Sequence, residues 1–280
     1  MCVRKIISLK YLFLAFVMTL LMSRSAYSQV MDYGIKAGFN ASWVRVDDDP
    51  DYRKATKIAP VPGFSAGAAF SFKLKKRYFL HAELLYSTKG QWLTENKLQP
   101  DLYGEKITYR YIDLPLTYNI YFKGKLSTKR FKWYAGIGPN FSYWLGGKGK
   151  MGHYQFDEFD QPDLEYKIKF GKRGDDFNAE NVYIDGAKRL QLGLNIGGGI
   201  MLEPANGSKV MFDLRFELGH TWLGTSEGAD YFYPSEYTTN LQVRNMGVRA
   251  SVMYMLERNT DKKTRNKGKS TIKNTGKKRR

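Results

Sequence analysis

Eight charged residues of this chain lie in apolar stretches, each with an apolar residue on either side. They are Lys36, Glu83, Asp113, Glu203, Asp213, Arg215, Glu217 and Arg249. A carboxylate pair such as Glu83 and Glu217 could supply a general acid and a general base if both faced an open cleft. Carboxylates and cations that share a closed interior would instead form ion pairs. The elements that hold these residues decide between the two kinds of chemistry.

The other residue types that catalysis and metal binding require are scattered along the sequence. His81, His153 and His220 lie in three separate stretches, and no Gly-x-Ser-x-Gly pattern supplies a nucleophile. The glycine-rich run 193–199 lacks the Lys-Ser/Thr pair of a phosphate loop. The sequence therefore predicts no catalytic site, no cofactor and no metal centre.

The elements follow a two-residue rhythm that is clearest between Tyr33 and Trp43. Every odd position there is apolar, and every even position, Lys36 among them, is small or polar. A period of two predicts a β-strand with one apolar face and one polar face. The eleven residues exceed a typical strand of a globular protein and match the about 9–11 residues that cross a bilayer at a tilt.

Eight stretches share this rhythm, at 33–43, 64–74, 78–87, 107–122, 131–145, 190–203, 210–218 and 246–256. The connections alternate between short ones (75–77, 123–130, 204–208) and long ones (44–61, 93–106, 146–187, 224–241). Short turns at one end and long loops at the other are typical of outer-membrane barrels. The sequence therefore predicts an all-β fold, an eight-stranded antiparallel transmembrane β-barrel with long outer loops, and both termini in the periplasm.

Both ends of the chain are predicted to lie outside the barrel itself, which we assign to 29–257. Residues 1–28 have a basic start, an apolar core and a small-x-small ending, which predicts a secretory signal peptide. Residues 258–280 carry eleven Lys or Arg and one Asp, and this composition predicts a disordered basic tail. We expect this periplasmic tail either to bind an anionic partner or to be a solvated extension.

Composition agrees with an exported membrane protein. The net charge of +18 is concentrated in the two terminal segments, so it does not indicate a nucleic-acid partner. Aromatic residues make up 15% of the chain, as the interfacial girdles of a barrel require. The single cysteine, Cys2, belongs to the predicted signal peptide, so the mature chain has no disulfide and no thiolate ligand.

In this barrel the eight charged residues face the interior. Eight strands enclose a space that side chains can just fill. We therefore expect a closed network of ion pairs, with a conducting pore and a proton or ligand site as the alternatives. Ile107, Tyr109 and Tyr111 have the opposite parity to the rest of their strand, which predicts a β-bulge near Tyr111. A soluble lipocalin-like barrel, with its apolar face inward, is the rival architecture.

Two of the predicted outer loops have unusual sequences. The acidic run Asp47–Asp51 could form a divalent-cation site that bridges to anionic lipopolysaccharide, or a solvated loop. The loop 146–187 mixes aromatic and charged residues at a length that is uncommon without a function. Within it, Tyr166–Phe170 alternates and could extend the strands above the membrane. This loop is either a binding surface or a hairpin without a specific ligand.

Four stretches in order resemble the PorT-like outer-membrane β-barrel family. They are YGIKAGFN at 33–40, ELLYSTKG at 83–90, YIDLPL at 111–116 and YAGIGPN at 134–140. The resemblance covers about residues 30–256 and implies an eight-stranded barrel in the outer membrane of a Gram-negative cell. The founding member of that family is linked to protein secretion. The chain departs from the family pattern because it continues for 24 residues past Leu256.

These observations favour a non-enzymatic integral protein of the cell outer membrane with a closed interior. Such a protein would act through its outer loops or its periplasmic tail, as an accessory of secretion or of envelope organisation. Outer-membrane lipid and lipopolysaccharide are its expected surroundings. A small-solute channel is the first alternative, and a lipid-modifying barrel enzyme is the second.

Overall fold

The computed structural model describes residues 31–46, 56–96, 102–126, 129–153, 163–172, 180–204, 208–225 and 241–258. The predicted signal peptide, the acidic run 47–51 and the basic segment 259–280 lie outside the described residues. No helix in the described part of the chain is long and apolar enough to cross a membrane.

Eight long strands and three short ones make up the described chain. The long strands are β1 (Met31–Val46), β3 (Val61–Lys75), β4 (Tyr78–Asn96), β5 (Leu102–Leu126), β6 (Lys129–His153), β9 (Leu190–Leu202), β10 (Ser208–Gly219) and β11 (Val243–Arg258). The short strands are β2 (Thr56–Ala59), β7 (Leu164–Phe170) and β8 (Asn181–Ile184).

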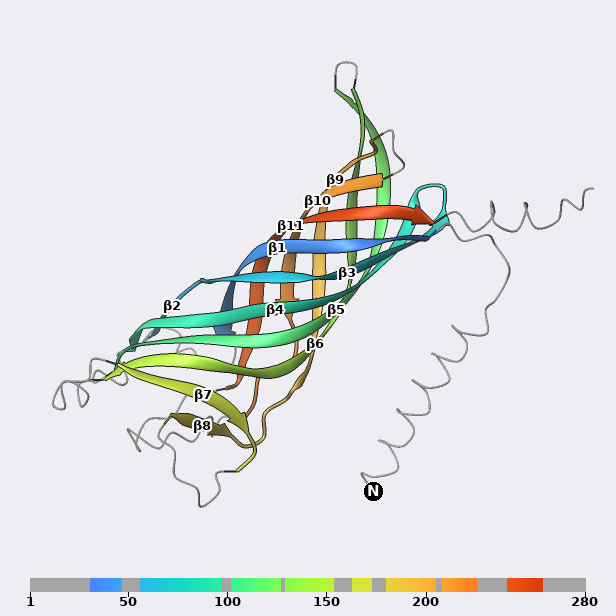
Figure 1. The fold of residues 1–280 in the computed structure, drawn as a ribbon. Helices are drawn as coiled ribbons and strands as arrows, with labels where there is room; N and C mark the ends of the chain where they lie inside the picture. Colours follow the sequence, from blue (N-terminus) through green and yellow to red (C-terminus); the bar gives the residue numbers. More distant parts are fainter. Residues whose placement is uncertain are drawn as a thin grey trace, which may run out of the picture. The chain divides into compact units, whose positions relative to one another are not determined.

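The eight long strands form a closed antiparallel ring. Each pairs with its neighbour in sequence order, and β1 pairs with β11 over its whole length, from Met31 opposite Arg258 to Val46 opposite Val243. Figure 1 shows this closure, with the blue β1 beside the orange-red β11. Because a closed ring has no free edge, every strand of the wall has two partners. The predicted fold class, an eight-stranded β-barrel, is confirmed.

The two ends of the ring differ. At the short-turn end, β1 begins, β11 ends, and only brief connections join β3 to β4, β5 to β6 and β9 to β10. At the long-loop end, β2 pairs with β4, β7 pairs with β6, and β8 pairs in parallel with β7 (Figure 1). The alternating segment Tyr166–Phe170 therefore does extend the sheet, as predicted. The wall continues beyond the eight-stranded ring on the side of β5 and β6.

The outer face of the ring is apolar and the inner face is polar. Phe39 is 80% exposed, whereas Lys36, on the opposite face of the same strand, is 1% exposed. Every strand of the ring contributes exposed apolar side chains, among them Ile35, Phe64, Leu84, Leu114, Ile137, Ile196, Leu214 and Val252. An apolar outer wall would be unstable in water and suits lipid. The lipocalin-like alternative, which needs the reverse orientation, is wrong.

The β-bulge is present, but it lies on the neighbouring strand. The pairing of β5 with β6 shifts by one residue between Arg110 and Tyr111, and the residue left without a partner is Leu145 of β6. Strand β5 keeps one parity throughout, so that Tyr109 and Tyr111 face inward and are fully buried. The prediction was right about the position of the bulge and wrong about its strand. It assumed that every apolar residue of β5 faces lipid, whereas at the long-loop end the apolar residues of β5 fill the interior.

The depth of the apolar wall in a bilayer can be tested by introducing a charge at two heights. Leu214 lies at the middle of β10 and Leu256 near the short-turn end of β11; both are exposed. We expect Leu214→Arg to lower the free energy of unfolding by about 2–4 kcal/mol, and Leu256→Arg by about 0–1 kcal/mol. Urea titrations of the protein folded into lipid vesicles measure both values. Equal costs at the two positions would contradict a membrane-spanning wall.

Candidate functional site

The interior charges form two quartets, each of two cations and two carboxylates. In the first, Lys36 Nζ lies 3.0 Å from Glu83 Oε2 and 2.7 Å from Asp213 Oδ2. The Arg215 guanidinium lies 2.7 Å from Glu83 Oε1 and 2.8 Å from Asp213 Oδ2. Tyr134 donates a further hydrogen bond to Asp213 at 2.8 Å. The formal charges of the four ionic side chains cancel, and all four are buried.

The second quartet lies closer to the long-loop end. Lys89 Nζ lies 3.0 Å from Asp113 Oδ2 and 3.2 Å from Glu217 Oε2. Arg249 Nη2 lies 3.0 Å from Asp113 Oδ2 and 2.7 Å from Glu217 Oε1. The hydroxyl of Ser87 donates to Asp113 at 2.6 Å. These four charges also cancel, so neither quartet leaves a net charge in the interior.

Both quartets join opposite walls of the barrel. In the ring order, β4 and β10 are four strands apart, and so are β5 and β11. Four is half of eight, so the contact between Glu83 on β4 and Arg215 on β10 spans the lumen. The contact between Asp113 on β5 and Arg249 on β11 does the same. The interior is therefore crossed by direct ionic contacts at two heights.

Small residues on β9 leave room for these side chains. Gly197 pairs with Arg215, and Gly199 pairs with Asp213. A Cβ atom added to Gly197 would lie 2.8 Å from Cγ of Arg215, too close for an ordinary contact. The glycine-rich run 193–199 is thus part of a strand, as expected from its lack of phosphate-loop residues. Its glycines permit the close approach of the wall and of the charged side chains inside it.

A layer of apolar and aromatic side chains covers the first quartet at the short-turn end. It consists of Ala69, Tyr121, Tyr134, Met201, Met211, Met253 and Met255, with Phe79 packed against it. His81 lies beside this layer, with its Nε2 2.8 Å from the Tyr121 hydroxyl. His81 faces inward as predicted. The polar contact of its Nε2 is with a tyrosine hydroxyl and not with a serine or threonine.

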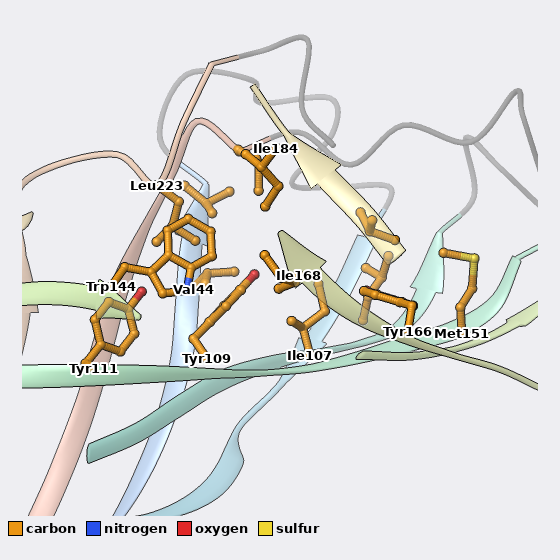
Figure 2. Close-up of a cluster of buried hydrophobic side chains, with 14 residues drawn as sticks. Val44, Ile107, Tyr109, Tyr111, Trp144, Met151, Tyr166, Ile168, Ile184 and Leu223 are labelled. Atoms are coloured by element: carbon orange, nitrogen blue, oxygen red, sulfur yellow. The ribbon is translucent and has the colours of Figure 1, made fainter. Parts of the chain in front are cut away.

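A larger apolar cluster lies at the long-loop end, beyond the second quartet; Figure 2 shows its side chains. Trp144 is fully buried in it, and its ring centroid lies 5.1 Å from that of Tyr109 and 4.9 Å from that of Phe170. Residues of β7 and β8, such as Ile168 and Ile184, are also part of this cluster (Figure 2). The interior thus has three layers: methionine-rich, ionic, and aromatic.

Seven of the eight charges predicted for the interior lie there, and Glu203 does not. Its side chain is 40% exposed and contacts Lys132 at the rim. The prediction for Glu203 is wrong because β9 ends at Leu202, and a strand's alternation has no meaning beyond its last residue.

Sequence reasoning also missed Lys89. The predicted strand stopped at Ser87, whereas β4 runs to Asn96, and the same alternation continued by two residues points Lys89 inward. Without it, the second quartet would have had two carboxylates and one cation.

The remaining residue types singled out in the sequence as possible metal ligands or catalytic groups stay apart in the described ranges. Groups of three or more His, Cys, Asp or Glu side chains that could hold a metal ion are absent there. His220 is exposed at the end of β10, and His153 ends β6, opposite Leu102. His220 is not part of either ionic quartet.

A closed ring with an apolar outer wall and an ion-paired interior defines a membrane-spanning β-barrel protein. Residues 27–221 match the family described as "Outer membrane protein beta-barrel domain". The match covers more than half of the chain, so the protein belongs to this family and to the cell outer membrane. No curated protein matches the chain in sequence.

Several solved structures are similar to this chain at low sequence identity. OprG from Pseudomonas aeruginosa is 11% identical over 82% of this chain and 92% of its own, with a TM-score of 0.38. Neisserial surface protein A is 11% identical over 79% of this chain and 95% of its own, with a TM-score of 0.34. Ail, the attachment invasion locus protein of Yersinia pestis, is 12% identical over 80% of this chain and 98% of its own, with a TM-score of 0.32.

A double-mutant cycle tests whether the second quartet acts as one balanced unit. Removing one partner, by Arg249→Met or Glu217→Gln, leaves a buried charge unpaired, which typically costs about 3–5 kcal/mol. Removing both leaves the neutral pair of Lys89 and Asp113. We therefore expect the double variant to lose clearly less stability than the sum of the single losses, measured by urea unfolding in lipid vesicles.

The rim pair of Lys132 and Glu203 is the matched control, since both side chains are more than one-third exposed. Lys132→Met and Glu203→Gln should each cost about 1 kcal/mol or less and should combine additively. Strictly additive losses in the buried quartet as well would mean that its charges are solvated independently, and the network would have to be abandoned.

Proposed function

We propose that this protein is a closed, non-conducting and non-enzymatic outer-membrane barrel that acts through its extended end. The observation that carries this proposal is the pair of ionic contacts that cross the lumen, Glu83 with Arg215 and Asp113 with Arg249. A continuous water path at either height would have to separate buried partners that are 2.7 Å and 3.0 Å apart, respectively.

The packing around the quartets supports closure. A cavity bounded in part by Lys89, Asn195 and Glu217 measures about 20 Å³. A volume of that size holds about one water molecule. Aromatic side chains above and methionine side chains below cover the ionic layer. These observations favour the closed barrel over the small-solute channel, which is the alternative.

The function of a closed barrel must lie at its ends. The long-loop end carries additional structure, the β7 and β8 strands on the extended β5–β6 hairpin. We place this end outside the cell and the short-turn end, with both termini, in the periplasm, because short periplasmic turns are typical of such barrels. The basic segment 258–280 is then a contact for an anionic partner in the periplasm.

An accessory role in secretion or envelope organisation, of the PorT-like kind, fits a barrel with a sealed interior and structured extensions. The lipid-modifying enzyme has less support. Such an enzyme needs a base beside a nucleophile, whereas His81 contacts Tyr121 inside the barrel.

Single-channel recording tests the closed interior. Protein reconstituted in a planar bilayer should give no stable conductance above that of the empty bilayer, because both quartets block the lumen. The double variant Arg215→Ala/Arg249→Ala, which removes both cross-lumen cations, should show openings if it folds. Folding is checked by the shift in gel mobility between heated and unheated samples.

A porin reconstituted in the same way shows that the assay detects a channel. Steady openings of the unmodified protein that disappear on Arg215→Ala or Glu217→Gln would overturn the closed interior and establish the channel.

Cysteine labelling of intact cells tests the orientation. Lys76 lies in the short turn between β3 and β4, and Asp185 follows β8 at the long-loop end; both are exposed. A membrane-impermeant maleimide should label Asp185→Cys in intact cells, and Lys76→Cys only after the outer membrane is permeabilised. The mature chain offers no other thiol if the predicted signal peptide is removed. The reverse labelling pattern would invert the proposed orientation.

A further inference from the structure

The outward face of the wall changes from apolar to basic where β6 continues beyond its pairing with β9. On β5, exposed Leu114 and half-buried Ile112 are followed outward by Arg110 and then Lys106. On β6, exposed Tyr143 and Leu145 are followed by Lys148 and Lys150. The strand β7, which pairs with β6, adds Lys167 and Lys169. These six exposed cations, Lys106, Arg110, Lys148, Lys150, Lys167 and Lys169, form what we call the basic face.

The β-bulge at Leu145 places the β6 lysines on this face. Before the bulge, the even-numbered residues of β6, such as Trp144, face inward; beyond it, the odd-numbered Met151 does. Without the extra residue, Lys148 and Lys150 would point into the apolar cluster around Trp144. The bulge therefore creates an apolar interior and a basic exterior in the same step.

Like charges face one another directly across the strands of the basic face. In one row Lys106 pairs with Lys150, which pairs in turn with Glu165 of β7, and in the next row Lys148 pairs with Lys167. Directly opposed like charges destabilise a sheet. Lys150 has a partner in Asp163 at 2.8 Å, whereas within the described ranges neither Lys148 nor Lys167 forms an ion pair. An anion bound between these rows would relieve the repulsion.

The basic face contains a cleft large enough for such an anion. Its volume is about 490 Å³, and Lys106, Lys148, Lys150 and Lys167 line it from three strands. Glu165 and Glu180 also line it, so the cleft is not uniformly positive. Four lysines against two carboxylates leave a surplus of positive charge. The volume is in the range of small-molecule sites and exceeds what an inorganic ion needs.

The height of the basic face argues for a headgroup that reaches far from the hydrocarbon. The six residue-to-residue steps from Ile112 to Lys106 extend about 20 Å along β5, or about 15 Å along the membrane normal at a typical strand tilt. The headgroup layer of a typical bilayer is only about 5–7 Å thick on each side. A headgroup with a sugar and several phosphates matches this range, whereas the single phosphate of a phospholipid reaches only its base.

We propose that the basic face binds the phosphorylated headgroup of a glycolipid in the adjoining leaflet, with a phosphate between Lys148 and Lys167. The lipid's acyl chains would lie against the apolar wall below, beside Leu114 and Tyr143. The placement of this glycolipid in the outer leaflet of the cell rests on the proposed function, which puts the long-loop end outside. Binding itself depends only on the folded barrel.

The test measures lipid binding by the purified full chain in a non-ionic detergent, so that orientation in a cell plays no part. The probe is bis-phosphorylated lipid A, compared with dephosphorylated lipid A and with phosphatidylglycerol. We expect Lys148→Glu/Lys167→Glu to weaken lipid A binding at least tenfold. The matched control is Lys76→Glu/Arg77→Glu in the exposed turn between β3 and β4, which makes the same change in net charge. Its affinity for lipid A should stay within about twofold of that of the unmodified protein.

Two further measurements keep the proposal open to refutation. If the double reversal does not fold, as judged by gel mobility, Lys148→Gln/Lys167→Gln should still show a clear loss of lipid A binding. Raising the salt from about 0.1 to about 1 M, which shortens the Debye length from about 10 to about 3 Å, should reduce the difference between the unmodified protein and the variants.

Unchanged lipid A binding by both Lys148/Lys167 variants would overturn the proposal. So would equal binding of lipid A and its dephosphorylated form. Phosphatidylglycerol binding as tight as lipid A binding, with the same dependence on Lys148 and Lys167, would show a general anionic-lipid surface and reject the glycolipid. A failure of the proposed orientation would instead appear in the labelling of intact cells and leave these results as they are.

Discussion

A charge inside a membrane-spanning barrel of eight strands has little water around it, so its stability depends on an opposite charge within reach. The idealised cost of moving one such ion into a low-dielectric medium is of order 20 kcal/mol, and it remains several kcal/mol after relaxation. Here each quartet has equal numbers of cations and carboxylates, and its contacts join strands on opposite sides of the ring, as from Asp113 to Arg249. The wall and the interior are therefore interdependent: the ring positions the charges, and the charges fill the ring.

Other features of the barrel follow from this constraint. Gly197 and Gly199 face the charged residues of β10, where a larger side chain would collide with Arg215 or with the neighbouring backbone. Apolar clusters lie on both sides of the ionic layer. At the long-loop end, the extra residue Leu145 changes which side chains of β6 face inward, and Trp144 is the last of the even-numbered ones. The same displacement turns Lys148 outward and gives the outer surface its basic character.

Much of the fold could be predicted from the alternation of apolar and polar residues, because a strand in a barrel wall has one face toward lipid and one toward the interior. The alternation assigned seven interior charges correctly and failed where a strand ended earlier or later than expected, at Glu203 and Lys89. It could not show which charges meet, because that depends on ring order and register. It also could not separate an inward tyrosine, such as Tyr109, from a lipid-facing one, since both are apolar in the pattern.

The central claim is that ionic contacts cross and close the lumen, and solid-state NMR of the isotopically labelled protein in lipid bilayers tests it most directly. Magnetisation transfer should connect a guanidinium nitrogen of Arg249 with the carboxyl carbon of Asp113, which the structure places on opposite strands with 3.0 Å between Nη2 and Oδ2. Slow exchange of the Arg249 guanidinium protons with water should accompany it. A guanidinium that correlates only with water, with no transfer to Asp113, would contradict the account and indicate a hydrated lumen.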